Sequence, residues 1–234
     1  MRRLARLLPP LFGLFAFPLA LSTGGCGGGT DDTSSSSAST GEVKTTGPAA
    51  SAGKKTTTHP GATPLPGQDS CEVVEITDLP EDSFNHIADC QAITYATDPP
   101  SGGDHWPFWA AYKEYTHAVP KEMYVHNLEH GSIVLLYKCD GECPDVVAAL
   151  DKVFNSKADP LCLTIPGGPH ARMVLTPDPT LKTPIAMAAW GSIYTATCID
   201  QKSLQAFADK FYGGGREQLC NDGEDIEAGF VPCQ

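Results

Sequence analysis

The stretch that organises this chain is Val125-His126-Asn127-Leu128-Glu129-His130-Gly131, and the apolar run Ser132–Tyr137 follows it at once. It places two imidazoles and a carboxylate within five residues, directly before a run whose composition predicts a buried strand. Imidazole and carboxylate groups bind borderline divalent metal ions, and two histidines four residues apart share one face if the backbone is helical. We therefore predict a metal site at this point of the chain.

Two further histidines are candidates to complete the site. His105 lies in the segment 95–107, where three prolines and two glycines break helix and strand, so we predict a long ordered loop. His170 follows another Pro- and Gly-rich stretch and precedes a predicted strand. Glu129 is either a ligand or the acceptor that orients an imidazole. The predicted ligand set, which leaves out His86 and His117, is His105, His126, Glu129, His130 and His170.

The sequence predicts the ligands but leaves the identity of the metal ion more open. Imidazole suits zinc, copper, iron and nickel, and we favour copper or zinc without choosing between them. Met123 and Met173 lie near candidate ligands in the sequence and would favour copper if they coordinated, but methionine in such places usually packs in a core.

Three other interpretations compete with a metal-binding protein. The histidines can form a buried hydrogen-bond network that pins the long loop to the strand. The aromatic segment from Trp106 to Tyr115 can line a groove for a carbohydrate or peptide, although such aromatics are more often core. The spacing His126-x-x-Glu129-His130 also matches the inverted pattern of zinc peptidases. That mechanism needs a longer helix and a further acidic ligand, whereas here Gly131 and a strand follow, so we predict no catalytic step.

Hydrophobic patterning predicts an α+β fold. We expect strands over 72–77, 132–137, 172–176 and 185–195, and helices over 144–155 and 203–212. Pro144 suits a first helical turn, and Gly213–Gly215 stops the second helix. The expected fold is a single disulfide-stapled domain with a small mixed sheet and two main helices.

Three motifs in this order resemble a known family: Pro99-Pro100-Ser101-Gly102-Gly103-Asp104-His105, then residues 125–131, then Ala189-Trp190-Gly191. Together they resemble the bacterial family catalogued as domain of unknown function 3105, over roughly Tyr95–Tyr212. The family usually has Thr-Ser-Gly-Pro-His where this chain has Ser101-Gly102-Gly103-Asp104-His105, so the loop differs in detail and keeps its histidine. The resemblance implies a fold unit and a site, and it implies no activity.

The first part of the chain predicts export. Residues 1–25 have a basic start and an apolar core of signal-peptide length, too short and too broken by prolines for a membrane span. Small residues before Cys26 resemble the lipobox of bacterial lipoproteins, although Thr23 stands where an aliphatic residue is usual. Residues 26–68 then read as the lipidated cysteine and a disordered Ser/Thr/Gly/Pro tether. The globular domain is expected over 69–234, attached to the membrane by the lipid anchor and facing the periplasm or exterior.

The net charge and the cysteine content restrict the classes of partner and the cellular environment that fit this protein. The chain has 16 basic and 28 acidic residues, a net charge of −12 that disfavours a nucleic-acid partner. After Cys26, an even number of cysteines in an exported domain predicts up to four disulfides, and sequence alone leaves their pairing open. From proximity we expect Cys71 to pair with Cys90, Cys220 with Cys233, and Cys139 with Cys143. The eight cysteines are Cys71, Cys90, Cys139, Cys143, Cys162, Cys198, Cys220 and Cys233.

Overall fold

The computed structural model describes residues 45–233, which contain three α-helices and eight strands. The helices are α1 (Lys121–Glu129), α2 (Pro144–Phe154) and α3 (Gln201–Phe211). The strands are β1 (Thr45–Thr46), β2 (Lys54–Thr58), β3 (Val73–Thr77), β4 (Thr94–Tyr95), β5 (Ile133–Tyr137), β6 (Met173–Pro177), β7 (Ile185–Ala189) and β8 (Ser192–Ala196). Two short 3₁₀ turns cover Ala50–Ala52 and Cys162–Thr164.

The main sheet is mixed and has the strand order β2-β3-β8-β7-β5-β6. Only β5 and β6 run parallel, and α2 forms part of the connection between them, as a parallel pair requires. The other neighbours are antiparallel, and β1 and β4 form a separate parallel pair. The fold is therefore α+β, as predicted.

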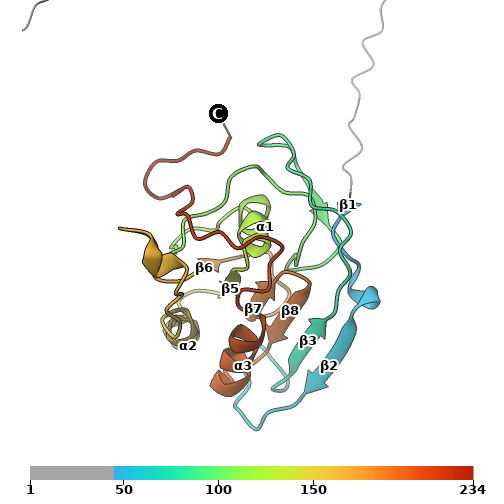
Figure 1. The fold of residues 1–234 in the computed structure, drawn as a ribbon. Coiled ribbons are helices and arrows are strands. Elements are labelled where there is room, and N and C mark those ends of the chain that lie inside the picture. The colour runs from blue at the N-terminus through green and yellow to red at the C-terminus, as the bar shows by residue number, and fades with distance from the viewer. Residues whose placement is uncertain (1–44, 234) are drawn as a thin grey trace, which may run out of the picture. The chain divides into compact units, whose positions relative to one another are not determined.

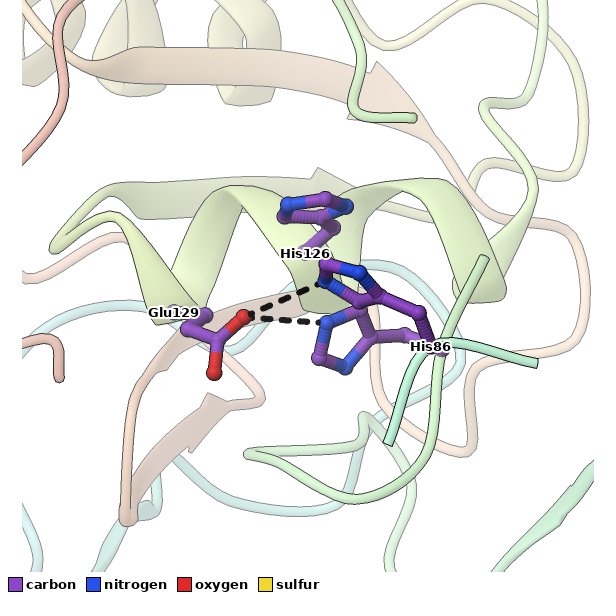
Figure 2. A group of neighbouring side chains, drawn as sticks. His86, His126 and Glu129 are labelled. Carbon is purple, nitrogen blue, oxygen red and sulfur yellow. Dashed lines mark hydrogen bonds and ion pairs between the residues drawn. The ribbon is translucent and has the colours of Figure 1, made fainter. Parts of the chain in front are cut away.

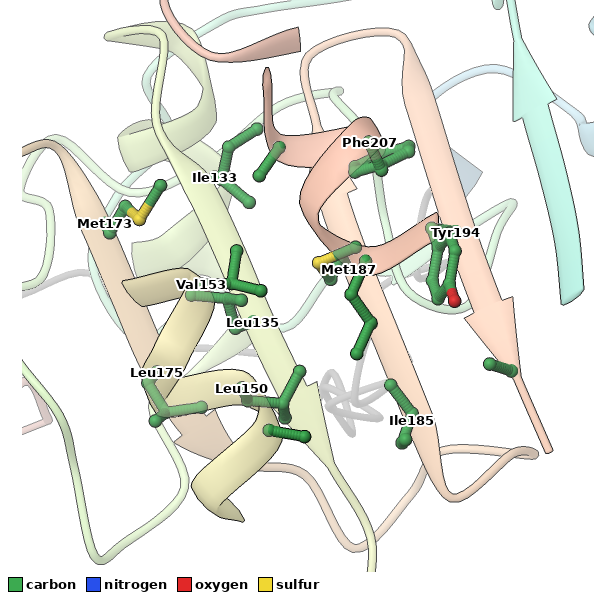
Figure 3. Packing of buried hydrophobic residues seen from close by; sticks show 14 of the residues in the cluster. Ile133, Leu135, Leu150, Val153, Met173, Leu175, Ile185, Met187, Tyr194 and Phe207 are labelled. Atoms are coloured by element: carbon green, nitrogen blue, oxygen red, sulfur yellow. The ribbon is translucent and has the colours of Figure 1, made fainter. Parts of the chain in front are cut away.

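The central strands are buried on both faces, which explains why β5 and β7 are almost wholly apolar. Alternate residues point to opposite sides, so Ile133 and Leu135 join a core with α2 and α3, while Val134 and Leu136 join a core with α1. Figure 1 shows α1 on one side of β5 to β7 and the other two helices on the opposite side. In Figure 3, Leu150 and Val153 of α2 and Phe207 of α3 pack over the strands.

Most predicted elements are confirmed, with two differences. The strand predicted over 185–195 is a hairpin, because Gly191 adopts φ +69° and forms with Trp190 the two-residue turn between β7 and β8. The segment that carries the central motif is itself a helix, α1, so the domain has three α-helices where two were predicted. The short length of α1, nine residues, hides its periodicity in the sequence.

The predicted tether is wrong for the described residues before Asp69. Residues Lys54–Thr58 form β2, which pairs antiparallel with all five residues of β3. All five side chains of β2 are exposed, so this edge strand is held by its ladder and has no apolar signature in the sequence. The predicted signal peptide, Cys26 and the earlier part of the tether lie outside the described residues.

All eight cysteines after Cys26 are paired, as Cys71–Cys198, Cys90–Cys233, Cys139–Cys143 and Cys162–Cys220. The expected Cys139–Cys143 pair is confirmed, and the expected pairs Cys71–Cys90 and Cys220–Cys233 are wrong. Strand register explains the first error: β3 and β8 place Val73 opposite Ala196, so two residues beyond them Cys71 meets Cys198. Four disulfides indicate an oxidising environment. None of the helices within residues 45–233 is long and apolar enough to cross a membrane.

Candidate metal centre

Helix α1 ends at the central motif with a backbone arrangement that fixes its last turn. His130 is the C-cap, the Gly131 N–H donates to the Leu128 carbonyl, and the Ser132 N–H donates to the Asn127 carbonyl. This is a Schellman motif, which needs a left-handed residue after the cap. Gly131 provides it at φ +84°, and a Cβ there would lie 2.9 Å from Nη1 of Arg172. The motif therefore turns the chain from α1 directly into β5.

Two motif side chains hold the loop that carries His105. The amide of Asn127 both accepts from the Ala110 N–H at 3.0 Å and donates to the Ala110 carbonyl at 2.7 Å. Nδ1 of His126 lies 2.8 Å from the Trp106 carbonyl oxygen. A carbonyl oxygen only accepts, so Nδ1 of His126 carries the proton and Nε2 is left with its lone pair. The loop is ordered as predicted, and residues 99–106 are buried.

His105 is fixed in the same way and points at Glu129. Its Nδ1 lies 2.8 Å from the Gly103 carbonyl oxygen, and its Nε2 lies 3.1 Å from Oε2 of Glu129. Both side chains are buried, with exposed fractions of 0% and 4%. Because Nδ1 donates to the carbonyl, a neutral His105 would direct the lone pair of Nε2 at a carboxylate oxygen. A proton or a metal cation between the two atoms removes that conflict.

His86, which the sequence prediction left out, is the third imidazole beside Glu129. Its Nε2 lies 3.7 Å from Oε2 of Glu129, and its ring lies 4.6 Å from the ring of His126, centroid to centroid. Figure 2 shows His86 reaching the carboxylate from a loop, while His126 and Glu129 project from α1. Half of the His86 side chain is exposed, so the cluster is open to solvent on this side.

The position of His86 follows from Asp104, one of the residues at which the loop differs from the family's usual sequence. Oδ1 of Asp104 accepts hydrogen bonds from Ser83 and from the backbone and side chain of Asn85. The Ile87 N–H donates to the His105 carbonyl, and the His105 N–H donates to the Asn85 carbonyl. These contacts place the segment that carries His86 beside His105. No local motif marks His86 in the sequence, so only the backbone pairing could have revealed it.

Four side chains, from His86, His105, His126 and Glu129, can each offer one ligand atom within 4.8 Å of all the others. An ideal tetrahedral shell with metal–nitrogen bonds of 2.0 to 2.1 Å separates its ligand atoms by about 3.3 Å. The distances of 3.1 and 3.7 Å from Glu129 to His105 and His86 bracket this value. Small rotations of the rings would complete such a shell, so the donor set fits a transition metal ion.

The charges of the cluster also suit a cation. Burial, together with the neighbouring His105 and His130, lowers the pKa of His126 to about 3, so this ring is neutral near pH 7. Burial opposes the ionisation of Glu129, but hydrogen bonds from His105 and Arg216 outweigh it and hold the pKa of Glu129 at about 2. The cluster thus pairs an ionised carboxylate with a neutral imidazole whose Nε2 is free of hydrogen bonds within residues 45–233. For Glu129 and His126, those are the protonation states that metal binding requires.

His130 lies beside the cluster without belonging to it. Its ring is 4.6 Å from the rings of both His126 and Trp109, and burial lowers the pKa of His130 to about 4 against the opposing charge of Glu129. Its Nε2 lies 3.6 Å from Glu217, and its buried Nδ1 has no hydrogen-bond partner in the described part of the chain. His130 therefore packs behind His126 and supports that ring.

Three other histidines of the described chain, His59, His117 and His170, are outside the cluster. His170 is exposed before β6 and is not among the four clustered side chains, which disagrees with its place in the predicted ligand set. His117 is 81% exposed and lies 3.2 Å from Glu227. Met123 and Met173 are fully buried in the two apolar cores, one on each side of the sheet. Methionine therefore gives no argument for copper.

The geometry does not match the arrangement suggested by the His-x-x-Glu-His spacing. In that arrangement His126 and His130 would be joint ligands and Glu129 a free base. Instead Oε2 of Glu129 contacts His105, and Oε1 accepts from Nη1 of Arg216 at 2.9 Å. Arg216 also contacts Glu81 at 2.8 Å and lies over the Phe84 ring. Glu129 is therefore part of the cluster, with one carboxylate oxygen contacting His105 and the other contacting Arg216.

The protein contains an α+β domain in which one short helix and two loops assemble a histidine–carboxylate cluster at the edge of a buried core. Residues 86–223, more than half of the chain, match the family model described as protein of unknown function, DUF3105, and the chain belongs to this family. The match includes all four clustered side chains. No curated protein and no solved structure matches the chain.

Proposed function

We propose that this protein binds a divalent transition metal ion, copper or zinc, through His86, His105, His126 and Glu129. The observation that carries the proposal is the pair of buried imidazoles whose Nδ1 atoms are each committed to a backbone carbonyl. Hydrogen bonds from Nδ1 to a backbone carbonyl fix the tautomer of metal-binding histidines and present Nε2 to the metal. A hydrogen-bonded network without metal would leave Nε2 of His126 without a protein partner within residues 45–233.

The same geometry favours a site that exchanges its metal with the surroundings. Three of the four side chains are buried, while His86 is half exposed and stands at the solvent side. An ion can therefore reach the buried ligands past His86 without unfolding of the domain. When bound, the metal would supply a Lewis acid or, as copper, a redox centre. We propose metal binding or handling as the role of the domain, with no catalytic step.

Elemental analysis of the full-length protein after exposure to zinc and to copper, followed by dialysis, tests the proposal. We expect about one equivalent of metal in the wild-type protein and loss of that equivalent in His105→Ala and in His126→Ala. The matched controls are His117→Ala and His170→Ala, which remove exposed imidazoles outside the cluster and should retain full stoichiometry. Circular dichroism of each variant separates loss of ligands from loss of fold.

Two outcomes would overturn the proposal. Wild-type protein that retains neither metal would favour the hydrogen-bonded network. Full stoichiometry in folded His105→Ala and His126→Ala would place the metal elsewhere. For copper-loaded protein, electron paramagnetic resonance gives an independent readout, because three nitrogen ligands produce hyperfine couplings that each substitution reduces.

We further propose that the domain acts at the bacterial cell envelope, attached to a membrane through a lipid on Cys26. The support is the signal-peptide pattern before Cys26 and the oxidising environment that the disulfides indicate. Mass spectrometry of the mature protein tests this part separately, since acylation adds the mass of its lipid chains to an N-terminal peptide that begins at Cys26. An unmodified N-terminus elsewhere would refute it and leave the metal proposal unaffected.

A further inference from the structure

A second chemically distinctive feature lies at the other end of β5, in the loop Cys139–Cys143. The disulfide between these cysteines spans four positions, whereas the other three span 58, 127 and 143. Both cysteines of the short loop are partly exposed. The pairs Cys71–Cys198 and Cys162–Cys220 are buried.

Two cavities of about 350 Å³ each lie against this disulfide. Both are lined by Cys139, Glu142 and Cys143, so both border the disulfide. Leu65 and Pro184 help to close the first cavity, and Tyr137 and Val147 help to close the second. Both cavities therefore offer space for a small dithiol beside the disulfide.

Cys143 occupies a position that stabilises a thiolate. It is the N-cap of α2, an 11-residue helix, and Pro144 follows it at the first helical position. The positive end of a helix favours a negative charge there. Lys138 and Lys182 line the first cavity and add positive charge, against the nearby carboxylates of Asp140, Glu142 and Asp145. Cys139 precedes the turn and lacks the helix terminus.

Opening this disulfide leaves the fold largely supported by other contacts. β5 is paired with β6 on one side and β7 on the other, and α2 is held by Val146, Leu150 and Val153 in the core. A disulfide that closes so short a loop also restricts the unfolded chain less than the other three disulfides do. Its loss therefore costs the fold less than the loss of any other disulfide.

We propose that Cys139–Cys143 is a thiol–disulfide exchange site that accepts electrons from a small dithiol. One substrate thiolate attacks Sγ of Cys139, a mixed disulfide forms, and Cys143 leaves as a thiolate at the helix terminus. The second substrate thiolate then attacks the substrate sulfur of the mixed disulfide and expels Cys139. The substrate is oxidised by two electrons to its disulfide, and both cysteines take up the protons that the dithiol lost.

The test uses full-length protein treated under native conditions with a limiting amount of dithiothreitol, quenched by alkylation at intervals and mapped by mass spectrometry. We expect Cys139 and Cys143 to be alkylated at least about tenfold faster than Cys90 and Cys233, with circular dichroism unchanged. Cys90–Cys233 is the matched control, because both of its cysteines are exposed and neither caps a helix. Faster or equal reduction of Cys90–Cys233 would overturn the proposal, and so would reduction of Cys139–Cys143 only when the protein unfolds.

Single variants test the direction of attack. The free Cys143 thiol of Cys139→Ser should react with iodoacetamide at lower pH than the free Cys139 thiol of Cys143→Ser. Equal pH profiles would contradict the assignment of Cys143 as the leaving group. None of these readouts depends on metal, so they fail or succeed independently of the proposed function.

Discussion

Replacing Glu129 by glutamine should destabilise the metal-free protein in a pH-dependent manner. The side chain is 4% exposed, its Oε2 lies 3.1 Å from His105, and its Oε1 lies 2.9 Å from Arg216. These contacts lower the pKa of Glu129 from 4.5 to about 2 despite its burial. A shift of that size corresponds to roughly 3 kcal/mol of stability. The amide keeps the volume and loses the charge, so most of this contribution disappears.

The sign follows from the depressed pKa. The unfolded carboxyl takes up its proton near pH 4.5 and the folded one near pH 2, so the contribution is complete above pH 4.5 and is lost as the pH falls toward 2. We expect Glu129→Gln to reduce the free energy of unfolding by about 2–3 kcal/mol at pH 7. The difference from wild type should shrink steadily below pH 4.5.

Urea unfolding of chelator-treated protein, followed by circular dichroism at pH 7, 5, 4 and 3, measures this effect. Glu81→Gln is the matched control, because Glu81 contacts the same Arg216 at 2.8 Å but is 47% exposed. Its loss should cost less than about 1 kcal/mol. Equal unfolding free energies for Glu129→Gln and wild type at pH 7 would refute the reasoning, as would a deficit of the same size at pH 3.

Three further predictions concern residues around the cluster. Asn127→Ala should reduce stability by about 2–4 kcal/mol, because it leaves the buried N–H and carbonyl of Ala110 without partners; a thermal melt within 1 °C of wild type would contradict this. Gly131→Ala should cost at least about 1–2 kcal/mol, since φ is +84° and the new Cβ would lie 2.9 Å from Arg172; urea unfolding measures it, and an unchanged midpoint would count against it. The His126 ring should be neutral at pH 5 by nuclear magnetic resonance, because its pKa in the folded protein is about 3. In the unfolded chain the ring takes up a proton near pH 6.5, so the free energy of unfolding falls as the pH drops from 6.5 toward 3. An imidazolium signal from His126 at pH 5 would disprove that assignment.

The pairing of distant segments was where prediction from sequence failed. β2 has five exposed side chains, so its sequence carries no apolar alternation, and only its ladder with β3 makes it a strand. His86 has no motif around it and reaches the cluster because its segment pairs with His105. Cys71 meets Cys198 through the register of β3 and β8. In each case the contact depends on residues far away in the chain, which local patterns do not record.

Local patterns of residues in the sequence predict the short-range structure of the chain. The α+β domain is predicted by the apolar runs of β5 and β7 and by the helical spacing of α2 and α3. The histidine-containing motifs also predict three of the four clustered side chains, His105, His126 and Glu129. Which histidines converge depends on how distant segments pack in the folded domain. His130 shares a helix with His126 but packs behind it, while His86 and His105 arrive on loops, because a site forms where backbone pairing brings donors together.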